Sequence, residues 1–392
     1  MKMNDNMKVP EGWKRVRLGE VVTENSKSPF KVEEADNEGR YPFFTSGEEI
    51  LKHSKFLIDD ENIFISTGGT AYVKYYNGKS SYSADTYSLK SKINTLYLYH
   101  FIYRKLNHIT LRYFIGSGLE HLQKQDFKNS FEVIFPIDPN EQQKIAEILE
   151  TVDRAIEKTD KIIEKYKRIK QGLMHDLLKK GIDENGKIRS EKTHKFKNSP
   201  LGRIPEEWEV VRLGEVIEIF DNKRIPLDGE YRSTIKGDIP YCGATGVIDF
   251  INDFIFDGEY VLIAEDGGKF QQFEKTAYIM NVKFWANNHV HIVRGKSNLC
   301  NLFMMYFINF KDISYYISGS TREKLNQQLL KSIPIPLPPL PEQQRIAEIL
   351  SQIDNTIEKE EAYKQKLDRI KKGLMEDLLT GRVRVNELIK EE

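Results

Sequence analysis

Two long stretches of the chain carry apolar residues at steps of three and four positions, with charged residues between them. The apolar positions are Ile145, Leu149, Val152, Ile156, Ile163, Tyr166, Leu173 and Leu177 in the first stretch and Ile346, Leu350, Ile353, Ile357, Leu367, Leu374 and Leu378 in the second. This spacing places each set on one face of a helix and is typical of a coiled-coil seam. We predict helices at residues 138–181 and 339–382, with Gly181 and Gly381 marking their ends.

Each apolar stripe has to be covered, either by the globular region that precedes the helix or by another helix. A helix of about 40 residues is roughly 60 Å long, and its stripe is narrow and flanked by Lys, Glu and Asp. Such a stripe suits a partner helix better than a domain surface. We therefore expect the two helices to pair with each other, and two-fold symmetry between the halves of the chain would make that pair antiparallel.

The chain contains an internal repeat. EQQKIAEIL at 141–149 returns as EQQRIAEIL at 342–350, and residues 141–181 share 22 identities in 41 pairs with residues 342–382. Upstream, WKRVRLGEVV and WEVVRLGEVI share seven of ten positions at an offset of 195. The segments between these repeats have diverged. We read this as a tandem duplication of one domain plus one helix.

The diverged segments predict mixed α/β domains. Short runs such as ENIFIS and TAYVKYY are rich in strand-forming residues, and Asn77-Gly78 predicts a hairpin turn. LYLYHFIYRKL and NLFMMYFINF read as helices. We therefore expect an α+β fold, in which two similar globular α/β domains are separated by an antiparallel two-helix coiled coil and related by a pseudo-two-fold internal repeat. The expected boundaries are 1–137 and 207–338 for the domains, 182–206 for a polar linker and 383–392 for a tail.

Composition narrows the function. Lys+Arg and Asp+Glu both total 59, so the field of the whole chain does not attract nucleic acid, and any affinity has to come from local basic surfaces or a basic partner. Two cysteines are too few for a disulfide framework and fit a reducing compartment. No window reaches 18 apolar residues and the start lacks a secretory signal, so we expect a cytoplasmic protein without membrane contact.

The arrangement resembles the DNA specificity (S) subunit of type I restriction-modification systems. The most specific marks are the entries PIDPNEQQKIAEIL and PLPPLPEQQRIAEIL, each following a divergent domain that opens W-x-x-x-x-L-G-E. The resemblance covers nearly the whole chain, and it occurs in two copies in register. It implies that each globular domain is a target-recognition domain that reads one half of a split DNA site.

The resemblance also implies partners and cofactors. The helices would set the unread spacer and dock two modification (methyltransferase) subunits, which bind S-adenosylmethionine. Restriction subunits, an ATP-dependent translocase and nuclease, would use ATP and Mg. Double-stranded DNA would be the ligand of the chain itself. The chain would then be no enzyme and would hold none of these cofactors.

Motifs that would argue for chemistry in this chain are weak. FIGSG at 114–118 imitates an S-adenosylmethionine loop, but no N-P-P-Y-like catalytic loop occurs. The GKS triplets at 78–80 and 295–297 lack the first glycine of a P-loop. His289 and His291 alternate on a predicted strand and would suit a metal, but no third ligand stands nearby in the sequence. We expect neither a catalytic site nor a metal site.

Candidate DNA contacts are the cationic, hydroxyl and amide side chains near predicted turns, because such groups bind phosphates and base edges. The segments GSGLEHLQKQDF and GSTREKLNQQLL add further residues, since in the family such segments lie in the recognition domain. The candidates are Thr67, Lys74, Tyr75, Lys79, Ser83, Ser117 and Lys124 in the first domain and Lys269, Gln271, Gln272, Asn287, Asn288, His289, Thr321, Arg322 and Lys324 in the second.

Two other functions remain open at this point. The chain could be a scaffold whose helices dimerise and whose domains bind protein, or a self-contained methyltransferase. A stable complex with adenine methyltransferase subunits that methylates a split site separates the specificity function from the scaffold. Binding of S-adenosylmethionine to the chain alone would indicate the methyltransferase.

Overall fold

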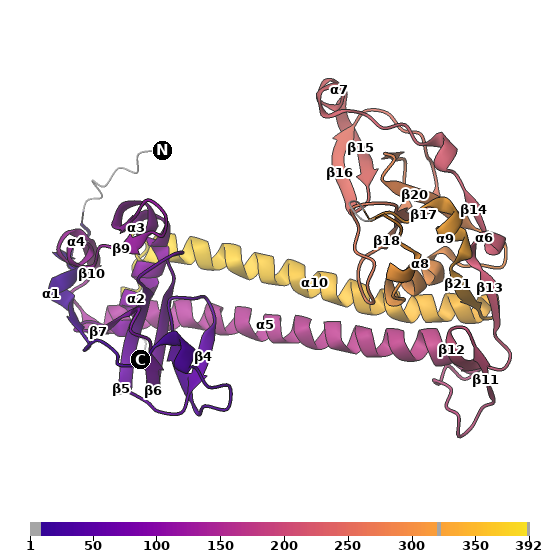
Figure 1. Ribbon diagram of the computed structural model, residues 1–392. Coiled ribbons are helices and arrows are strands. Elements are labelled where there is room, and N and C mark those ends of the chain that lie inside the picture. Colours follow the sequence, from indigo (N-terminus) through magenta and orange to yellow (C-terminus); the bar gives the residue numbers. More distant parts are fainter. Residues whose placement is uncertain (1–8, 320–322, 390–392) are drawn as a thin grey trace. The chain divides into compact units, whose positions relative to one another are not determined.

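The computed structural model describes residues 9–319 and 323–389 (Figure 1). The chain divides into two units, one formed by residues 1–160 and 362–392 and the other by residues 161–361. Each unit contains a mixed α/β region and part of each long helix, α5 (Pro139–Lys180) and α10 (Leu340–Leu378). The fold is therefore a duplicated mixed α/β fold with two long helices, as the sequence predicts.

The first unit is built around a six-stranded sheet with the strand order β2-β7-β5-β6-β3-β4. Helix α2 (Thr95–Arg104) contacts β5, β6 and β7, since one of its faces buries Tyr97, Leu98 and Phe101. The strands are β2 (Val22–Glu24), β3 (Tyr41–Phe44), β4 (Ile50–His53), β5 (Ile58–Ser66), β6 (Val73–Tyr82) and β7 (Thr86–Ser91). The other elements are β1 (Trp13–Arg17), α1 (Leu18–Val21), α3 (Leu106–Tyr113), β8 (Phe114–Ile115), β9 (His121–Leu122), α4 (Lys124–Ser130), β10 (Glu132–Pro136) and α11 (Asn386–Ile389).

The predicted hairpin turn at Asn77-Gly78 is wrong. Both residues lie inside strand β6, where Asn77 pairs with Glu61 and Gly78 with Asp60 of β5. The continuous pairing of β5 with β6 overrides the local turn preference, and Gly78 stays in the strand with φ of 124°. The turn between these strands falls instead at residues 67–72.

The second unit contains a four-stranded sheet, β14-β20-β17-β18, and a three-stranded sheet, β16-β15-β19. Helix α8 (Asn301–Phe310) contacts β17, β18 and β20 through its buried aromatic residues. The strands are β14 (Ile217–Ile219), β15 (Lys236–Gly243), β16 (Gly246–Ile251), β17 (Glu259–Ala264), β18 (Ala277–Asn281), β19 (Trp285–Ala286) and β20 (Val290–Gly295). The remaining elements are β11 (Phe196–Ser199), β12 (Gly202–Pro205), β13 (Glu209–Arg212), α6 (Leu213–Val216), α7 (Gly229–Thr234), α9 (Gln327–Ser332) and β21 (Pro334–Leu337).

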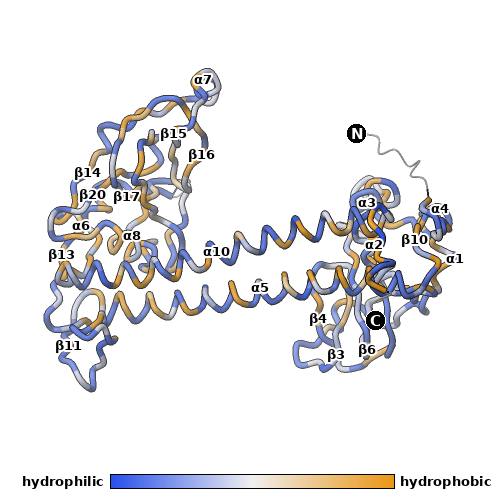
Figure 2. The backbone as a smooth tube through the Cα atoms, turned by 180° about the vertical axis from the view of Figure 1, so that it is seen from behind, coloured by the Kyte–Doolittle hydropathy of each residue, from blue (hydrophilic) through white to orange (hydrophobic). Residues whose placement is uncertain are grey.

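The long helices contact each other in antiparallel order within each unit. In the first unit, Asp153 pairs with Lys371 at 2.5 Å and Asp160 with Lys364 at 2.6 Å. In the second unit, Lys170 pairs with Asp354 at 2.5 Å and Lys167 with Glu361 at 3.2 Å. Residue numbers rise on one helix as they fall on the other, which only an antiparallel pair allows. Figure 2 shows polar and apolar residues alternating along both helices.

The apolar stripe is covered in two ways. Among its predicted members, the buried ones are Ile145, Leu149, Ile163, Leu177, Ile346, Leu350, Ile357, Leu367 and Leu378, and the half-buried ones are Val152, Ile156, Tyr166, Leu173, Ile353 and Leu374. The first turns of each helix also belong to the core of the preceding domain, where Ile145 joins Trp13 and Ile346 joins Trp208. At its start, each long helix therefore packs on its own globular domain, which was the alternative to pairing with the other helix. Four buried residues were not among the predicted stripe positions: Met174, Leu178, Met375 and Leu379.

The segment 182–206 is more ordered than the predicted linker. It contains the β11–β12 hairpin, and the Arg189 side chain is 8% exposed because it pairs with Glu342 at the start of α10. Glu342 also accepts hydrogen bonds from the Ile182 amide at 2.9 Å and from Trp208 Nε1 at 3.2 Å. The polar composition of this segment reflects a buried ion pair as well as a solvated surface.

The repeat-equivalent carboxylate, Glu141, has the same role in the first unit. Its two oxygens accept from Arg384 at 2.6 and 2.8 Å, and the Glu141 side chain is 2% exposed. In both units, an arginine that follows the end of one long helix therefore binds the glutamate that opens the other.

Candidate nucleic-acid interface

Four loops of the first unit converge on one surface, the first loop cluster (residues 45–49, 66–70, 83–86 and 116–121). Thr67 connects them, since its amide donates to Ser46 Oγ at 3.1 Å and its hydroxyl to the Asp85 carbonyl at 2.7 Å. The Gly69 amide donates to the Glu120 carbonyl at 3.0 Å. The loops are therefore held to one another by short polar contacts.

The second unit has a matching surface, the second loop cluster (residues 243–246, 264–269, 286–289, 318–319 and 323–325). The Asn287 amide donates to the Cys242 carbonyl at 3.0 Å, next to this cluster, and the Glu265 amide donates to the His289 carbonyl at 2.9 Å. The Leu325 amide donates to the Glu265 carbonyl at 2.7 Å. Four loops again share one framework.

The two clusters have the same backbone frame and different side chains. The hydrogen bond from Leu325 to Glu265 repeats the one from the Leu122 amide to the Thr67 carbonyl at 3.0 Å. Two residues further along each loop, Gly69 and Gly267 adopt φ of 70° and 67°, a conformation that favours glycine. Thr67 and Glu265 therefore occupy equivalent positions. A duplicated frame with divergent side chains suits two surfaces that bind different ligand sequences.

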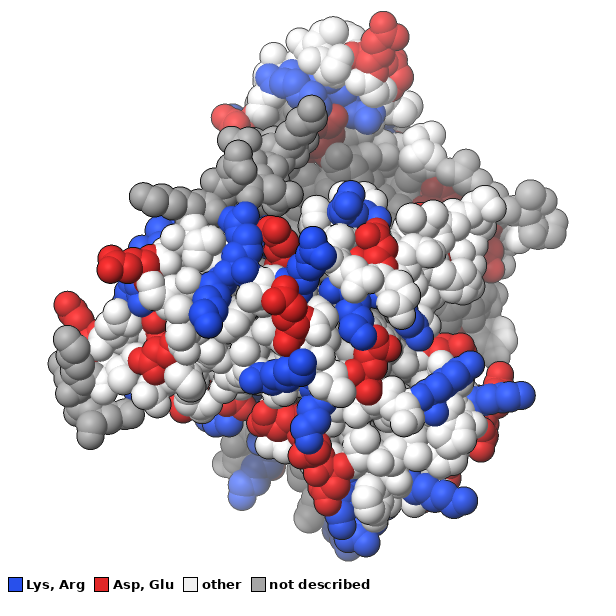
Figure 3. Space-filling model, turned by 90° about the vertical axis from the view of Figure 1, so that its left-hand side faces the viewer, with Lys and Arg blue, Asp and Glu red and all other residues white. Residues whose placement is uncertain are grey.

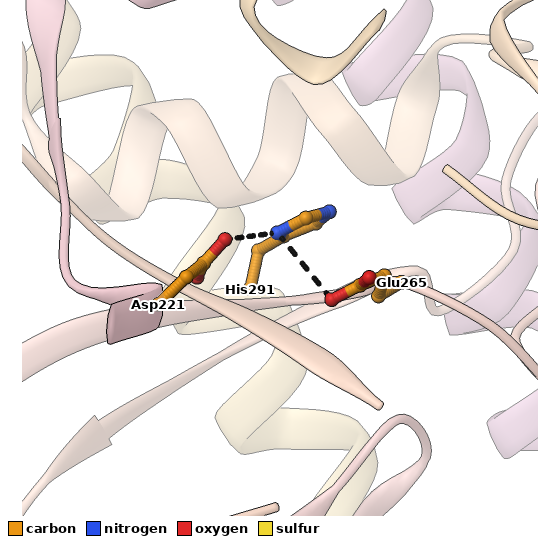
Figure 4. Close-up of side chains that lie close together, drawn as sticks. All are labelled: Asp221, Glu265 and His291. Atoms are coloured by element: carbon orange, nitrogen blue, oxygen red, sulfur yellow. Dashed lines mark hydrogen bonds and ion pairs between the residues drawn. The ribbon is translucent and has the colours of Figure 1, made fainter. Parts of the chain in front are cut away.

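A buried ionic cluster underlies the second loop cluster (Figure 4). His291 Nδ1 lies 2.6 Å from Asp221 Oδ2 and 3.8 Å from Glu265 Oε2. Glu265 also pairs with Arg224 at 2.5 Å and with Lys324 at 2.8 Å. Burial raises the pKa of the Glu265 carboxyl, but the Lys324 and Arg224 contacts outweigh it and the net pKa is lowered. For Asp221, burial is again the largest single effect and raises the pKa, but the contacts with His291, the Ile292 amide and Arg224 together outweigh it and the net pKa is lowered.

The same three residues have the spacing of a metal site, since their ligand atoms lie within 4.8 Å of one another. Each of those atoms already has a protein partner. His291 Nε2 lies 2.7 Å from the Leu325 carbonyl oxygen, so both ring nitrogens face oxygen atoms, and the two carboxylates are neutralised by protein cations. The ionic cluster is therefore explained by protein charges alone. The expectation that the chain holds no metal stays a prediction.

The predicted contact residues of the first unit fall into two groups. Ser83 is fully buried against Thr86, which contradicts phosphate contact, and the Lys74 ammonium donates to the carbonyls of Thr45, Gly47 and Glu49. Burial lowers the pKa of Lys74. Both residues therefore hold the loops in place, because packing satisfies their polar groups.

The remaining candidates of the first unit have polar atoms nearer solvent. Thr67 and Ser117 lie in the first loop cluster, and Lys79 is exposed on β6. Tyr75 donates to Glu61 at 3.0 Å, and the Lys124 ammonium lies 5.2 Å from the centre of the Tyr87 ring. Their contact with DNA stays a prediction.

In the second unit, Asn287 contradicts its predicted role, because it is buried and its side-chain oxygen accepts from the His289 amide at 2.9 Å. Lys269, Gln271, Gln272 and Asn288 are exposed. His289 pairs with Asp266 at 2.6 Å, and Lys324 pairs with Glu265. Thr321 and Arg322 lie outside the described residues. Asp221, Arg224 and Glu265 were missed, since no local sequence pattern joins residues 221–224 to Glu265 and His291.

On the face drawn in Figure 3, lysine and arginine side chains alternate with aspartate and glutamate, and the residues described there form no broad area of one sign. Attraction to a polyanion therefore depends on particular side chains or on a partner.

A second repeated site lies where each domain helix meets the long helices. In the second unit, the Tyr306 hydroxyl of α8 donates to Asp354 at 2.7 Å, beside the Lys170–Asp354 pair. In the first unit, His100 of α2 stands next to the Asp153–Lys371 pair, with Nδ1 3.9 Å from Asp153, too far for a hydrogen bond. Among the residues that the structure describes, neither ring nitrogen of this buried histidine has a hydrogen-bond partner, and burial, with a contribution from Lys371, lowers its pKa to about 3.

Acidification is expected to destabilise the first unit through His100. Its pKa of about 3 lies below the value of 6.5 for an unperturbed histidine, so at intermediate pH the unfolded chain binds a proton that the folded chain does not. The free energy of unfolding of the first unit is therefore not reduced by His100 above about pH 6.5, and below that pH it falls by about 1.4 kcal/mol per pH unit. His100→Leu should flatten this dependence without lowering stability at neutral pH, because leucine leaves no unpaired nitrogen. Urea unfolding between pH 7 and 5 measures both, and an unchanged acid dependence in the variant would contradict this account.

The fold and the two loop clusters define a tandem-repeat protein with two related but non-identical loop surfaces. A family model described as the type I restriction modification DNA specificity domain matches the chain twice, over residues 10–167 and 205–369. The chain belongs to this type I restriction-modification DNA specificity family. No helix in the described ranges is long and apolar enough to cross a membrane.

Individual relatives agree with this assignment. The chain is 29% identical over 425 aligned positions to the type I restriction enzyme MjaVIII specificity subunit of Methanocaldococcus jannaschii. That alignment covers 97% of this chain and 95% of the MjaVIII subunit. The chain is 28% identical over 380 positions to the EcoDI specificity subunit of Escherichia coli, covering 90% and 84%. The crystal structure of a type I S subunit from M. genitalium has a similar fold, with a TM-score of 0.71, 18% identity and coverage of 96% and 98%.

Proposed function

We propose that this chain is a non-catalytic specificity subunit in which each unit reads one half of a bipartite DNA site. The observation that carries the proposal is the pair of loop clusters, which share a backbone frame and differ in side chains. A duplicated reader with two different surfaces matches a split site with two different half-sequences. The divergence at equivalent positions, Thr67 against Glu265 and His121 against Lys324, supports the difference.

The long helices set the unread spacer and dock two modification subunits. Half-sites one helical turn apart are separated by roughly 34 Å, which is less than the length of a 42-residue helix at about 1.5 Å per residue. The modification subunits supply S-adenosylmethionine binding and adenine methylation, and the restriction subunits use ATP and Mg. The mixed charge on the face drawn in Figure 3 fits this division, because a basic partner would add phosphate contacts to those of the chain.

A reconstituted methylation assay tests the proposal. The purified chain, mixed with adenine methyltransferase subunits of the same system and S-adenosylmethionine, should form a stable complex that methylates DNA at a split site. The chain alone should bind no S-adenosylmethionine, and the methyltransferase subunits alone should leave the site unmethylated. Methyl transfer by the chain alone, or a complex that methylates without regard to sequence, would overturn it.

A further inference from the structure

The ionic cluster of the second unit joins segments that are distant in sequence at the second loop cluster. Asp221 follows β14, Glu265 follows β17 and His291 lies on β20 (Figure 4). Lys324 precedes α9. Asp221 also accepts from the Ile292 amide at 3.0 Å, and Arg224 donates to the Val290 carbonyl at 2.8 Å. Three strand ends and one loop are therefore tied to the same charges.

Burying these charges is costly. The side chains of Asp221, Glu265 and His291 are 7%, 9% and 1% exposed. Removing ions from water costs several kcal/mol per ion, and a buried pair often gains little net stability over apolar residues of the same size. The ionic cluster therefore needs an explanation other than stability.

The first unit supplies an internal comparison. The strand pairings that position Asp221, Glu265 and His291 place Ser26, Thr67 and Tyr87 at the equivalent positions. These three residues carry no charge at neutral pH, yet the first loop cluster has the same backbone frame. The same backbone frame therefore forms in the first unit without these charges, so what they add in the second unit is their effect on the side chains that the second loop cluster presents.

Lys324 is the cation of the ionic cluster that reaches the surface. Its side chain is 47% exposed, whereas that of Arg224 is 14% exposed. Glu265 holds the Lys324 ammonium at 2.8 Å and cancels its charge. A cancelled lysine adds little long-range attraction to phosphates, so its contribution comes from a contact of defined geometry.

We propose that Glu265, anchored through Arg224 and His291, is a positioning residue that orients Lys324 for sequence discrimination in one half-site and suppresses its sequence-independent attraction to DNA. This inference rests on the proposed function. A free lysine would both contact a base or phosphate in a defined geometry and attract DNA of any sequence. In this proposal Lys324 makes the defined contact, and Glu265 orients Lys324 and suppresses the general attraction.

The test compares Glu265→Gln, Lys324→Met and the double variant, each assembled with the modification subunits. Glu265→Gln releases the lysine charge, so binding to unrelated duplex should strengthen, and its salt dependence should steepen by about one unit in log–log slope. Discrimination at one half-site should fall about tenfold, with the other half-site unchanged. The double variant should lose the gain in unrelated binding. A merely structural role would weaken all binding and would not steepen the salt dependence.

Two measurements keep the outcome clear. Lys324→Met removes a surface group and should fold normally, and it should also lose discrimination at that one half-site. Glu191→Gln, which breaks the exposed Arg203–Glu191 pair of the second unit at 2.9 Å, outside the second loop cluster, is the matched control and should read both half-sites as the wild type does. The inference is overturned, and the proposed function stands, if the wild-type complex reads a split site and the Lys324→Met complex discriminates at both half-sites as well as the wild type does. If the wild-type complex reads no split site, the proposed function itself fails.

Discussion

Replacing Glu342 with alanine is expected to lower the free energy of unfolding of the second unit by about 3–5 kcal/mol, because it removes the buried counter-ion of Arg189 and leaves this arginine paired with the exposed Glu207 carboxylate at 3.1 Å. The carboxylate binds Arg189, whose side chain is 8% exposed, and accepts from the Ile182 amide and from Trp208 Nε1. Trp208 is fully buried, so its indole N–H would lose its partner without gaining a contact with bulk solvent.

Glu141→Ala is the matched control, since Glu141 occupies the equivalent place in the repeat. Its partner Arg384 is 31% exposed and can turn into solvent once the carboxylate is gone. The loss should therefore be smaller, about 1–3 kcal/mol, and confined to the first unit. Urea unfolding gives the magnitudes, and amide hydrogen exchange shows which unit opens. Equal losses for both variants, or a Glu342→Ala protein as stable as the wild type, would refute the role of the buried pair.

Lengthening both long helices by one heptad is expected to abolish methylation at the native site and to move the optimum to a longer spacer. The boundary between the units falls after Asp160 in α5 and after Glu361 in α10, so duplicating residues 154–160 and 355–361 leaves the contacts of each unit intact. Seven residues add about 10.5 Å, the rise of about three base pairs. A heptad also keeps the apolar stripe on nearly the same face.

A set of duplexes with the native half-sites and increasing spacers measures this effect. The matched control carries the heptad in α5 alone. Asp153 and Lys170 can then no longer both meet their partners on α10, so this variant should methylate no duplex. A doubly lengthened protein that still prefers the native spacer would show that the helices do not set the distance.

Sequence reasoning succeeded where the signal is local and copied. The long helices follow from apolar residues three and four positions apart, and the duplication follows from two nearly identical helix starts. It failed where pairing between distant segments decides the outcome. Asn77-Gly78 has the composition of a turn, but pairing with β5 keeps both residues in β6. The segment around Arg189 has the composition of a linker, but its buried partner Glu342 lies 153 residues away.

The contact surfaces show the same limit. Thr67 and Lys269 could be placed in loops from the sequence because they flank glycines that signal a turn, and their contact with DNA stays a prediction. The ionic cluster was missed because it joins residues 221–224 to Glu265, His291 and Lys324, which lie tens of residues further along the chain. Ser83 and Asn287 look like surface polar groups in the sequence, and only the three-dimensional packing shows that they are buried.

Sequencing of methylated bases across the genome, in a host with and without this gene, tests the central claim most directly. Two different readers connected by helices that set a spacer should produce one adenine-methylated motif that consists of two unlike half-sites around an unspecified spacer, and this motif should lose its methylation when the gene is removed. A single uninterrupted motif, two identical half-sites, or a methylation pattern that does not depend on the gene would contradict it.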